Sequence, residues 1–406
     1  MKTQGFAALL SLSLSIAGLA ACASTTGEAD EATSDALSVK GVTKAERDQY
    51  LASAKIWSDP NPADDLLTGP RGADSFPATR NADGTATIPS ITCEFIEPTT
   101  KNELGGLSPK FQCGACKDGC NVDKTLKVKF GQTADSNGEI YGEVMATRLF
   151  RAVGLKTDDV YPVRVTCKNC PPDPWAVYHD FTPGAGARAD RVYTAALIER
   201  KYDGKKIEID SWPADKDGEG FSFDEVEKDR TKMANRGASE PEWSAFKLLA
   251  AFIKHSDNKA ANQRLVCATG AIDAQAHCTS PFLMIQDPGS TFGGGGGILG
   301  TTNSDTKARY EEWSEKDVWR DRSACQAALF SFYYTDPVVS EGGRQLLARR
   351  LAALTDTQLH DIFTASRITE RGETLKDHGT VRAVTVDDWV AAFKEKRDEL
   401  SKPCGG

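Results

Sequence analysis

The eleven cysteines constrain the fold of this chain more than any other feature, because they follow a predicted secretion signal. The first 22 residues carry Lys2, then an uncharged apolar stretch too short to span a bilayer comfortably, and then small residues before Cys22. Export carries a chain into an oxidising compartment, where cysteines form disulfides. The sequence therefore predicts an exported protein whose cysteines are mainly disulfide-bonded.

The end of this signal resembles a bacterial lipobox. Leu19-Ala20-Ala21-Cys22 matches its pattern, which implies cleavage before Cys22 and acylation of that residue, so that a lipid takes the place of a transmembrane helix. Ala23 stands where an Asp would resemble an inner-membrane retention signal, which favours the outer membrane, on its periplasmic or surface face. The alternative is an ordinary signal peptide with a chance cysteine. We expect a lipid-anchored envelope protein.

The cysteines other than Cys22 number ten, which allows five disulfides. The spacing of CGAC (113–116) and CKNC (167–170) is also typical of zinc ribbons, but export favours disulfides that tie adjacent strands. We expect Cys267–Cys278 to close a hairpin and Cys325–Cys404 to close the C-terminal part, and the other pairings stay open. The candidates are Cys93, Cys113, Cys116, Cys120, Cys167, Cys170, Cys267, Cys278, Cys325 and Cys404.

The charge of the chain argues against nucleic acid as a partner. The 49 Lys and Arg residues are outnumbered by 58 Asp and Glu residues, and the net charge of -9 provides no positive field to collect a polyanion. A chain of 406 residues is long enough for one large or two modest domains.

Composition and periodicity divide the chain after its signal into three parts. Residues 23–88 are rich in acidic residues, Pro and Gly, which predicts a disordered tether, with folded structure beginning near Pro89. Residues 89–212 contain several short strand patterns and one amphipathic helix that ends near Gly154. Residues 213–406 are mainly helical in pattern, with capping boxes predicted at Ser239, Thr355 and Thr385.

A polar loop follows the first of these capped helices. The stretch HSDNKAAN, residues 255–262, places Asp257, Lys259 and Asn262 close together, and alone it is typical of an ordinary turn. It resembles the protein-kinase catalytic loop H-R-D-x-K-x-x-N, with Ser256 in place of the Arg. In that family the carboxylate orients the attacking hydroxyl, the ammonium neutralises the moving phosphate, and the amide oxygen binds magnesium.

Two other stretches match kinase motifs in the expected order. Downstream, an apolar strand ends in Asp287-Pro288-Gly289, which resembles the D-F-G motif whose Asp binds magnesium. Upstream, LKVKF (126–130) resembles the strand whose Lys reaches the nucleotide phosphates, and the next helix carries Glu residues that could pair with this Lys.

The identity of this Lys–Glu pair stays open at the sequence level. Lys127 and Lys129 share one face of the strand, and Glu139 and Glu143 share one face of the helix. We choose Lys129 because it directly precedes the Phe-Gly that ends the strand, and Glu143 because it is central in the amphipathic run.

The resemblance covers roughly residues 90–330 and implies an α+β, two-lobed protein-kinase-like fold. Its small β-rich N-lobe would be residues 89–212, and its larger helical C-lobe residues 213–406. It implies a phosphotransferase that uses ATP or another nucleotide with magnesium on a hydroxyl acceptor. The implied residues are Lys129, Glu143, Gly105 and Gly106 for the nucleotide, Asp257 and Lys259 for catalysis, and Asn262 and Asp287 for the metal.

The chain also departs from the family pattern. No G-x-G-x-x-G precedes Lys129, no A-P-E follows Asp287, and Ser256 removes the Arg that would receive an activation-loop phosphate. The resemblance is therefore to atypical secreted kinase-like proteins. The alternatives are a non-catalytic kinase-like binding module, which the scarcity of ATP outside the cell favours, and a disulfide-rich structural lipoprotein.

Overall fold

The computed structural model describes residues 42–61, 64–72, 74–181, 186–208, 220–232, 237–293, 307–331, 333–377 and 379–405. The predicted signal peptide and the lipidation candidate Cys22 lie outside these residues. Among the described residues, no helix is both long enough and apolar enough to cross a bilayer.

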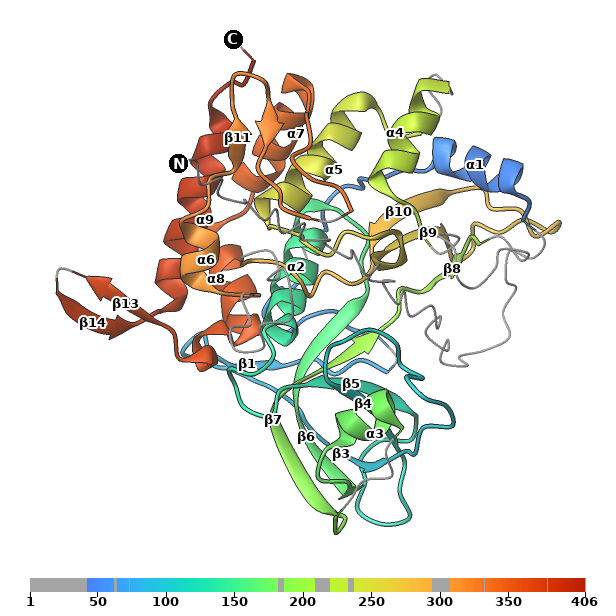
Figure 1. Ribbon diagram of the computed structural model, residues 1–406, viewed down its shortest axis with the longest axis vertical. Coiled ribbons are helices and arrows are strands. Elements are labelled where there is room, and N and C mark those ends of the chain that lie inside the picture. Colours follow the sequence, from blue (N-terminus) through green and yellow to red (C-terminus); the bar gives the residue numbers. More distant parts are fainter. Residues whose placement is uncertain are drawn as a thin grey trace, which may run out of the picture.

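Five strands form a closed barrel, which lies at the lower end of the molecule in Figure 1. Its order is β3-β4-β5-β7-β6; β3 pairs with β6 in parallel, and the other neighbours are antiparallel. Closure removes the strand edges that an open sheet would expose. The strands are β3 (Ser90–Phe95), β4 (Lys110–Gly114), β5 (Leu126–Phe130), β6 (Asp159–Cys170) and β7 (Ala189–Arg200).

The predicted helix of this region is α2 (Glu139–Val153), which lies between the barrel and the helices above it (Figure 1). It packs against α8 (Asp356–Ser366) on one side and against β6 and β7 on the other, so nearly all of its side chains are buried. It ends at Gly154, as the sequence predicts, with a φ of 85° that glycine adopts without strain. A helix enclosed in this way is held by both parts of the molecule.

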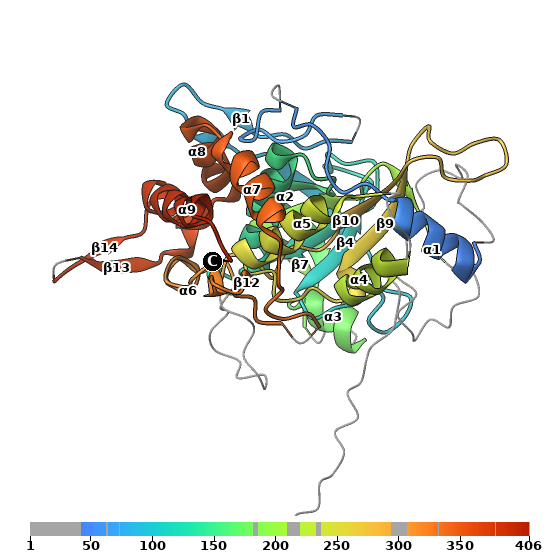
Figure 2. The ribbon, with the colours of Figure 1, turned by 90° about the horizontal axis from the view of Figure 1, so that it is seen from above.

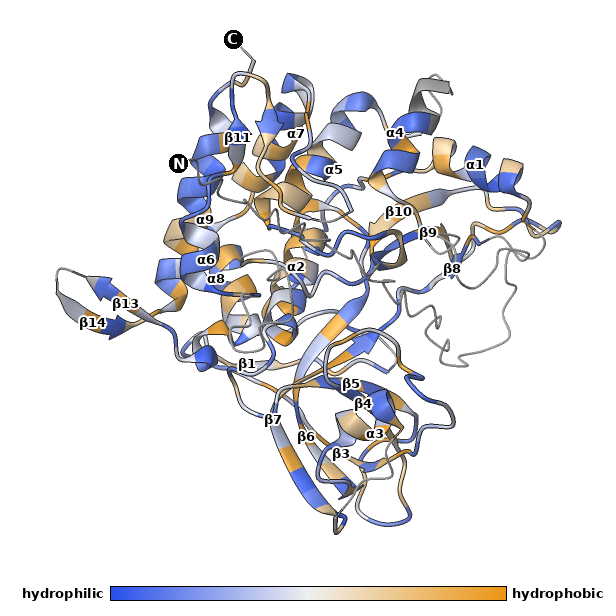
Figure 3. Ribbon diagram, viewed as in Figure 1, coloured by the Kyte–Doolittle hydropathy of each residue, from blue (hydrophilic) through white to orange (hydrophobic). Residues whose placement is uncertain are grey.

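The second half of the chain is mainly helical, as predicted, so the protein has a mixed α and β fold. The capping boxes at Ser239, Thr355 and Thr385 are confirmed at the starts of α5 (Glu240–Phe252), α8 and α9 (Val386–Ser401). Figure 3 shows hydrophilic and hydrophobic residues alternating around peripheral helices such as α9. The remaining helices of this half are α4 (Phe223–Lys232), α6 (Tyr310–Ser314), α7 (Glu341–Ala352), η1 (Ala260–Asn262) and η2 (Ile368–Arg371).

The prediction of a tether up to residue 88 is wrong for the described residues from Val42 onward. Residues Lys44–Ser53 form α1, and side chains such as Leu51, Trp57 and Leu67 are buried in the core of the helical part. The chain then runs on through two short strands, β1 (Thr79–Arg80) and β2 (Ala86–Thr87). Sparse apolar residues among Pro, Gly and Asp give no periodic signal, yet several of them, such as Leu66 and Leu67, are buried in a core formed mainly by distant segments.

The predicted boundary at residue 212 between the two halves is also too late. The strand β8 (Gly204–Lys206) pairs with β9 (Gln263–Ala268), which in turn pairs with β10 (Pro281–Ile285). This antiparallel sheet belongs to the second half, so the chain leaves the barrel directly after Arg200, at the end of β7.

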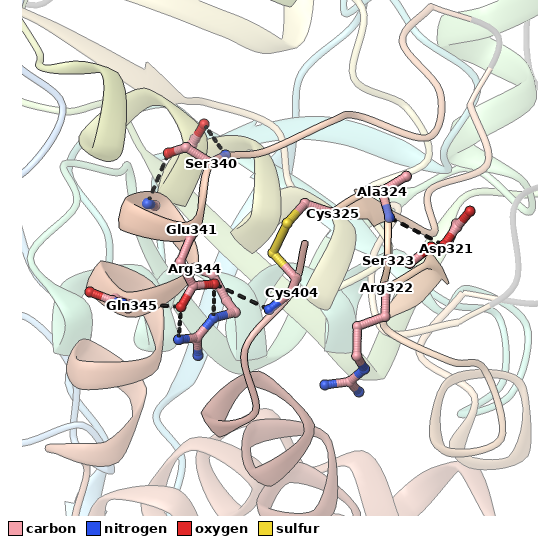
Figure 4. The surroundings of a disulfide bond; sticks show 12 residues. Asp321, Arg322, Ser323, Ala324, Cys325, Ser340, Glu341, Arg344, Gln345 and Cys404 are labelled. Atoms are coloured by element: carbon pink, nitrogen blue, oxygen red, sulfur yellow. Dashed lines mark hydrogen bonds and ion pairs between the residues drawn. A yellow bond between two sulfur atoms is a disulfide. The ribbon is translucent and has the colours of Figure 1, made fainter. Parts of the chain in front are cut away.

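Five disulfides join the ten candidate cysteines, which fits an oxidising, extracellular environment and leaves none of them for zinc. The predicted pairs Cys267–Cys278 and Cys325–Cys404 are confirmed. Figure 4 shows the second pair beside Glu341, whose carboxylate accepts bonds from the Arg344 side chain and the Cys404 backbone amide. The other three pairs are Cys93–Cys113, Cys116–Cys120 and Cys167–Cys170.

Three further elements lie at the periphery of the molecule. Figure 2 shows the hairpin of β13 (Thr374–Asp377) and β14 (Thr380–Ala383) projecting away from the helices. A second hairpin consists of β11 (Trp319–Asp321) and β12 (Gln326–Ala327). The short helix α3 (Pro174–Asp180) packs against β4 of the barrel.

Candidate active site

A buried Lys–Glu ion pair joins the barrel to α2. The Nζ atom of Lys129, on β5, lies 2.7 Å from Oε2 of Glu143, and both side chains are almost completely buried. The alternation of side chains along β5 directs Lys127 to the same face, but its Nζ lies 3.2 Å from Glu199 on β7. Glu139, one turn before Glu143, pairs instead with Lys307. Of the two Lys and two Glu residues left open by the sequence, Lys129 and Glu143 are therefore the pair.

Asp287 reaches this pair from the opposite side. It follows β10, and its Oδ1 atom lies 3.1 Å from Nζ of Lys129. The Asp287-Pro288-Gly289 turn packs directly on α2, because a Cβ atom at Gly142 would lie only 2.6 Å from the carbonyl oxygen of Gly289. The hydroxyl of Thr291 also donates to the Gly142 carbonyl at 3.2 Å. Only a residue without a side chain fits at position 142 without a shift of the turn.

The loop after α5 is tied to the same turn by backbone hydrogen bonds. The amide of Gln286 donates to the carbonyl of Asn262 at 2.9 Å, and the amide of Ser256 donates to the carbonyl of Ser290 at 3.0 Å. The side-chain amide of Asn262 donates to the carbonyl of Asp257 at 2.7 Å. The loop and the turn thus form one unit, with Asn262 next to Asp287 in space.

Asp257 and Lys259 form an ion pair at the exposed side of this unit. Oδ2 of Asp257 lies 3.1 Å from Nζ of Lys259, and each side chain is about one third exposed. His255, at the start of the loop, is completely buried, and burial lowers its pKa to about 4, so its ring is neutral at pH 7. His255 is enclosed by the protein, so Asp257 rather than His255 is the group that a ligand can contact here.

The electrostatics around Lys129 are dominated by carboxylates. Burial lowers the pKa of Lys129, but attraction by Asp287, Glu143 and Glu199 outweighs this and raises it well above its ordinary value. Burial raises the pKa of Glu143 to about 8 against the opposing pull of Lys129, with Glu199 and Asp287 adding to the increase. One ammonium is thus shared among three carboxylates and stays charged, and crowding of these acids together with burial disfavours the charged form of Glu143.

Glu199 is a participant that the sequence analysis missed. Its Oε2 atom lies 3.2 Å from Lys127 and 3.7 Å from Lys129, and the side chain is buried. A signal was present, because Glu199 is an acid directly after the apolar run Ala195–Ile198 and shares a strand face with Leu197. The pairing of β7 with β5, which brings Glu199 to the lysines, could not be inferred from that pattern.

Gly105 and Gly106 lie in the loop between β3 and β4, with φ values of 59° and 62° that favour glycine. This loop leads into Lys110, which is opposite Lys129 in the register of β4 and β5. The hydroxyl of Ser108 donates to Glu139 on α2, so the loop is held at the start of that helix. The structure therefore places the two glycines beside the strand of Lys129.

One hollow of the described structure lies apart from these residues. It has a volume of about 260 Å³ and lies at the base of the β13–β14 hairpin, where none of the site residues contributes to its lining. Its walls include Arg309, Tyr310, Glu373 and Leu375.

Comparison with known proteins gives limited information. No family model matches the chain, and no curated protein matches it. Among solved structures, the chain is similar to the crystal structure of a Helicobacter pylori proinflammatory kinase, CtkA, with 11% sequence identity and a TM-score of 0.33. The match covers 77% of this chain and 99% of that chain. A likeness at this level carries no argument about activity, which has to come from the site itself.

Proposed function

We propose that the chain is an exported kinase-like protein, anchored through Cys22, that binds a nucleotide with Mg²⁺ and transfers a phosphoryl group to a hydroxyl acceptor. One observation carries this proposal: Lys129 contacts both Glu143 and Asp287, while Asn262 connects Asp287 to the loop of Asp257. Residues from four separate segments of the chain thus converge, in the arrangement expected for phosphoryl transfer.

The nucleotide would be held by Lys129 and by the loop of Gly105 and Gly106. Glu143 fixes the Lys129 ammonium by an ion pair that is buried on both sides, so the charge is aimed before a ligand binds. Preorganised charge of this kind stabilises phosphates more than a mobile surface lysine does. The backbone amides of a glycine turn can approach phosphate oxygens closely because no side chain intervenes.

The residues present fit a magnesium ion. Asp287 and Asn262 supply a carboxylate and an amide oxygen, the hard donors that Mg²⁺ prefers, and Mg²⁺ commonly completes its shell with water and phosphate oxygens. Among the described residues, no cluster of three His, Cys, Asp or Glu side chains forms an all-protein metal site, so the ligand phosphates would be needed. When bound, the ion would neutralise phosphate charge.

The acceptor hydroxyl would bind at Asp257. This carboxylate is partly exposed, lies in the loop next to Asn262 and can accept the hydroxyl proton. Lys259, 3.1 Å from Asp257, would face the transferred phosphoryl group and offset its charge. Both side chains are about one third exposed, so a ligand can reach them.

The test is unfolding of the purified protein with and without Mg²⁺–ATP. A ligand at 100 times its Kd stabilises a folded protein by about 2.7 kcal/mol. We expect wild type to show this gain only with Mg²⁺ present, Asp287→Asn to lose it, and Asp257→Asn to keep it while losing phosphoryl transfer. Asp356→Asn, which changes an exposed acid on α8, is the control and should behave as wild type.

Undiminished Mg²⁺-dependent stabilisation of Asp287→Asn would contradict the metal assignment. The same experiment addresses the non-catalytic alternative, because a binding module would show Mg²⁺–ATP stabilisation in wild type with no transfer to any hydroxyl acceptor. A protein with neither property would leave only the structural lipoprotein.

A further inference from the structure

Three cations of the helical part meet two acids at the start of α2. Nη2 of Arg309 lies 2.7 Å from Oδ1 of Asp135, and Nη2 of Arg371 lies 3.2 Å from the same oxygen. Lys307 pairs with Glu139, the first residue of α2. All three cations come from the part of the chain that follows the Asp287 turn.

This cluster, which we call the α2 latch, is built into the packing. The Arg371 side chain is completely buried; its Nη1 atom donates to the carbonyl of Lys307 at 2.9 Å, and its guanidinium lies 5.6 Å from the centre of the Tyr141 ring. Lys307 and Glu139 are also mostly buried, with 29% and 11% of their side chains exposed. Such pairs are screened less by salt than pairs on the surface.

The latch lies one helical turn from the Lys129 pair. Glu139 and Glu143 are four residues apart on α2, so they face the same side of the helix. Whatever fixes Glu139 therefore also fixes Glu143, and hence its approach to Lys129. Ser108 adds a second contact to Glu139, because its hydroxyl donates to that carboxylate and ties the glycine loop to the start of α2.

We propose that Lys307, Arg309 and Arg371 are positioning residues that hold α2 where Glu143 can pair with Lys129, without any phosphorylated residue. This inference rests on the proposed nucleotide site and adds how the helix that carries Glu143 is kept in position. The acids that the cations need are supplied by α2 and the residues before it, namely Glu139 and Asp135. Ser256 already stands where kinases carry the Arg that receives a regulatory phosphate, so no such phosphate is required. The nucleotide site is then assembled whenever the chain is folded.

The test compares Lys307→Gln and Asp135→Asn with wild type in two measurements. The first is hydrogen exchange of the α2 amides, which needs no ligand, and the second is the Kd for Mg²⁺–ATP. We expect α2 to exchange at least about fivefold faster, and the Kd to rise at least about fivefold, in both variants. Lys307→Arg, which keeps the charge, should restore both values.

Lys394→Gln is the matched control. Lys394 is about as exposed as Lys307 and pairs with Asp356 at 2.8 Å, but this pair joins α9 to α8 within the helical part. Its loss should change both measurements less than about twofold. Because Asp135 is 54% exposed, Asp135→Asn should fold even if Lys307→Gln does not.

Unchanged α2 exchange in Asp135→Asn, or in both variants, would overturn the latch. Faster α2 exchange in the variants of a protein that binds no Mg²⁺–ATP would support the latch and overturn the proposed nucleotide site, so the two failures are distinguishable. A fivefold loss of affinity with unchanged α2 exchange would show that Lys307 contacts the ligand directly, which also overturns a positioning role.

Discussion

Replacement of Gly142 by Ala separates two opposing effects on α2. Ala is favoured over Gly inside a helix by about 1 kcal/mol, so propensity alone predicts a more stable protein. The new Cβ atom, however, would lie 2.6 Å from the carbonyl oxygen of Gly289 and 3.2 Å from the hydroxyl of Thr291. The nearest of these atoms belongs to the backbone, which cannot rotate away as a long side chain can.

The steric effect should exceed the propensity effect. Overpacking of a tight interior typically costs about 1–3 kcal/mol, so the net loss of unfolding free energy should be about 0–2 kcal/mol. The loss in function should be larger than this suggests, because relief of the contact moves α2 away from the turn of Asp287. That movement separates Glu143 and Asp287, the two acids that Lys129 joins.

The assay is chemical denaturation together with the Kd for Mg²⁺–ATP. Gly342→Ala on α7 is the control, because the nearest atom to its new Cβ would be Cγ of Pro241, a side-chain atom 3.1 Å away. We expect the control to keep its affinity and to change little in stability, and Gly142→Ala to bind at least about tenfold more weakly. A Gly142→Ala protein that is more stable by about 1 kcal/mol, with unchanged affinity, would refute the reasoning.

Two further predictions concern stability alone. Arg148 is buried on α2, and its guanidinium nitrogens have no hydrogen-bond partner among the described residues. Burial lowers its pKa to about 10, and this shift corresponds to a cost of about 3 kcal/mol for holding the charged guanidinium in the core. Arg148→Met should therefore raise the unfolding free energy in urea by about 1–3 kcal/mol, and an equal loss would show that the charge is compensated. The Cys325–Cys404 disulfide closes a loop of 79 residues. Its removal by paired Ser substitutions should therefore lower the unfolding free energy by about 4 kcal/mol, because the unfolded chain gains the freedom of the open loop. A loss below about 1 kcal/mol would contradict this reasoning.

The parts of the fold that the sequence predicted are those fixed by local patterns. The caps at Ser239, Thr355 and Thr385 depend on two residues three apart, and the end of α2 depends on Gly154. Strand alternation alone cannot distinguish Lys127 from Lys129, because both side chains point to the same face of β5. Only the position of Glu199 on the neighbouring β7 explains why Lys127 has a different partner.

The parts that the sequence did not predict depend on contacts between distant segments. Residues 42–88 lack hydrophobic periodicity, and several of them are buried by the helical part, as when Trp57 donates its indole N–H to the carbonyl of Glu242. The latch is similar, because Asp135 and Arg371 are 236 residues apart in the chain. Charged residues are common on surfaces, so nothing in the sequence marks these two as partners.

The acidity of the site limits the form in which a nucleotide could bind. The single charge of Lys129 is already shared among the carboxylates of Glu143, Asp287 and Glu199, and Lys259 is paired with Asp257. Nucleotide phosphates placed among these carboxylates would meet like charge, since the two ammoniums cannot offset both the acids and the phosphates. A divalent cation between Asp287 and the phosphates changes this balance by two charges at the point of greatest repulsion. The proposed function therefore requires that the metal and the nucleotide bind together, and it is the carboxylates, more than the lysines, that impose this requirement.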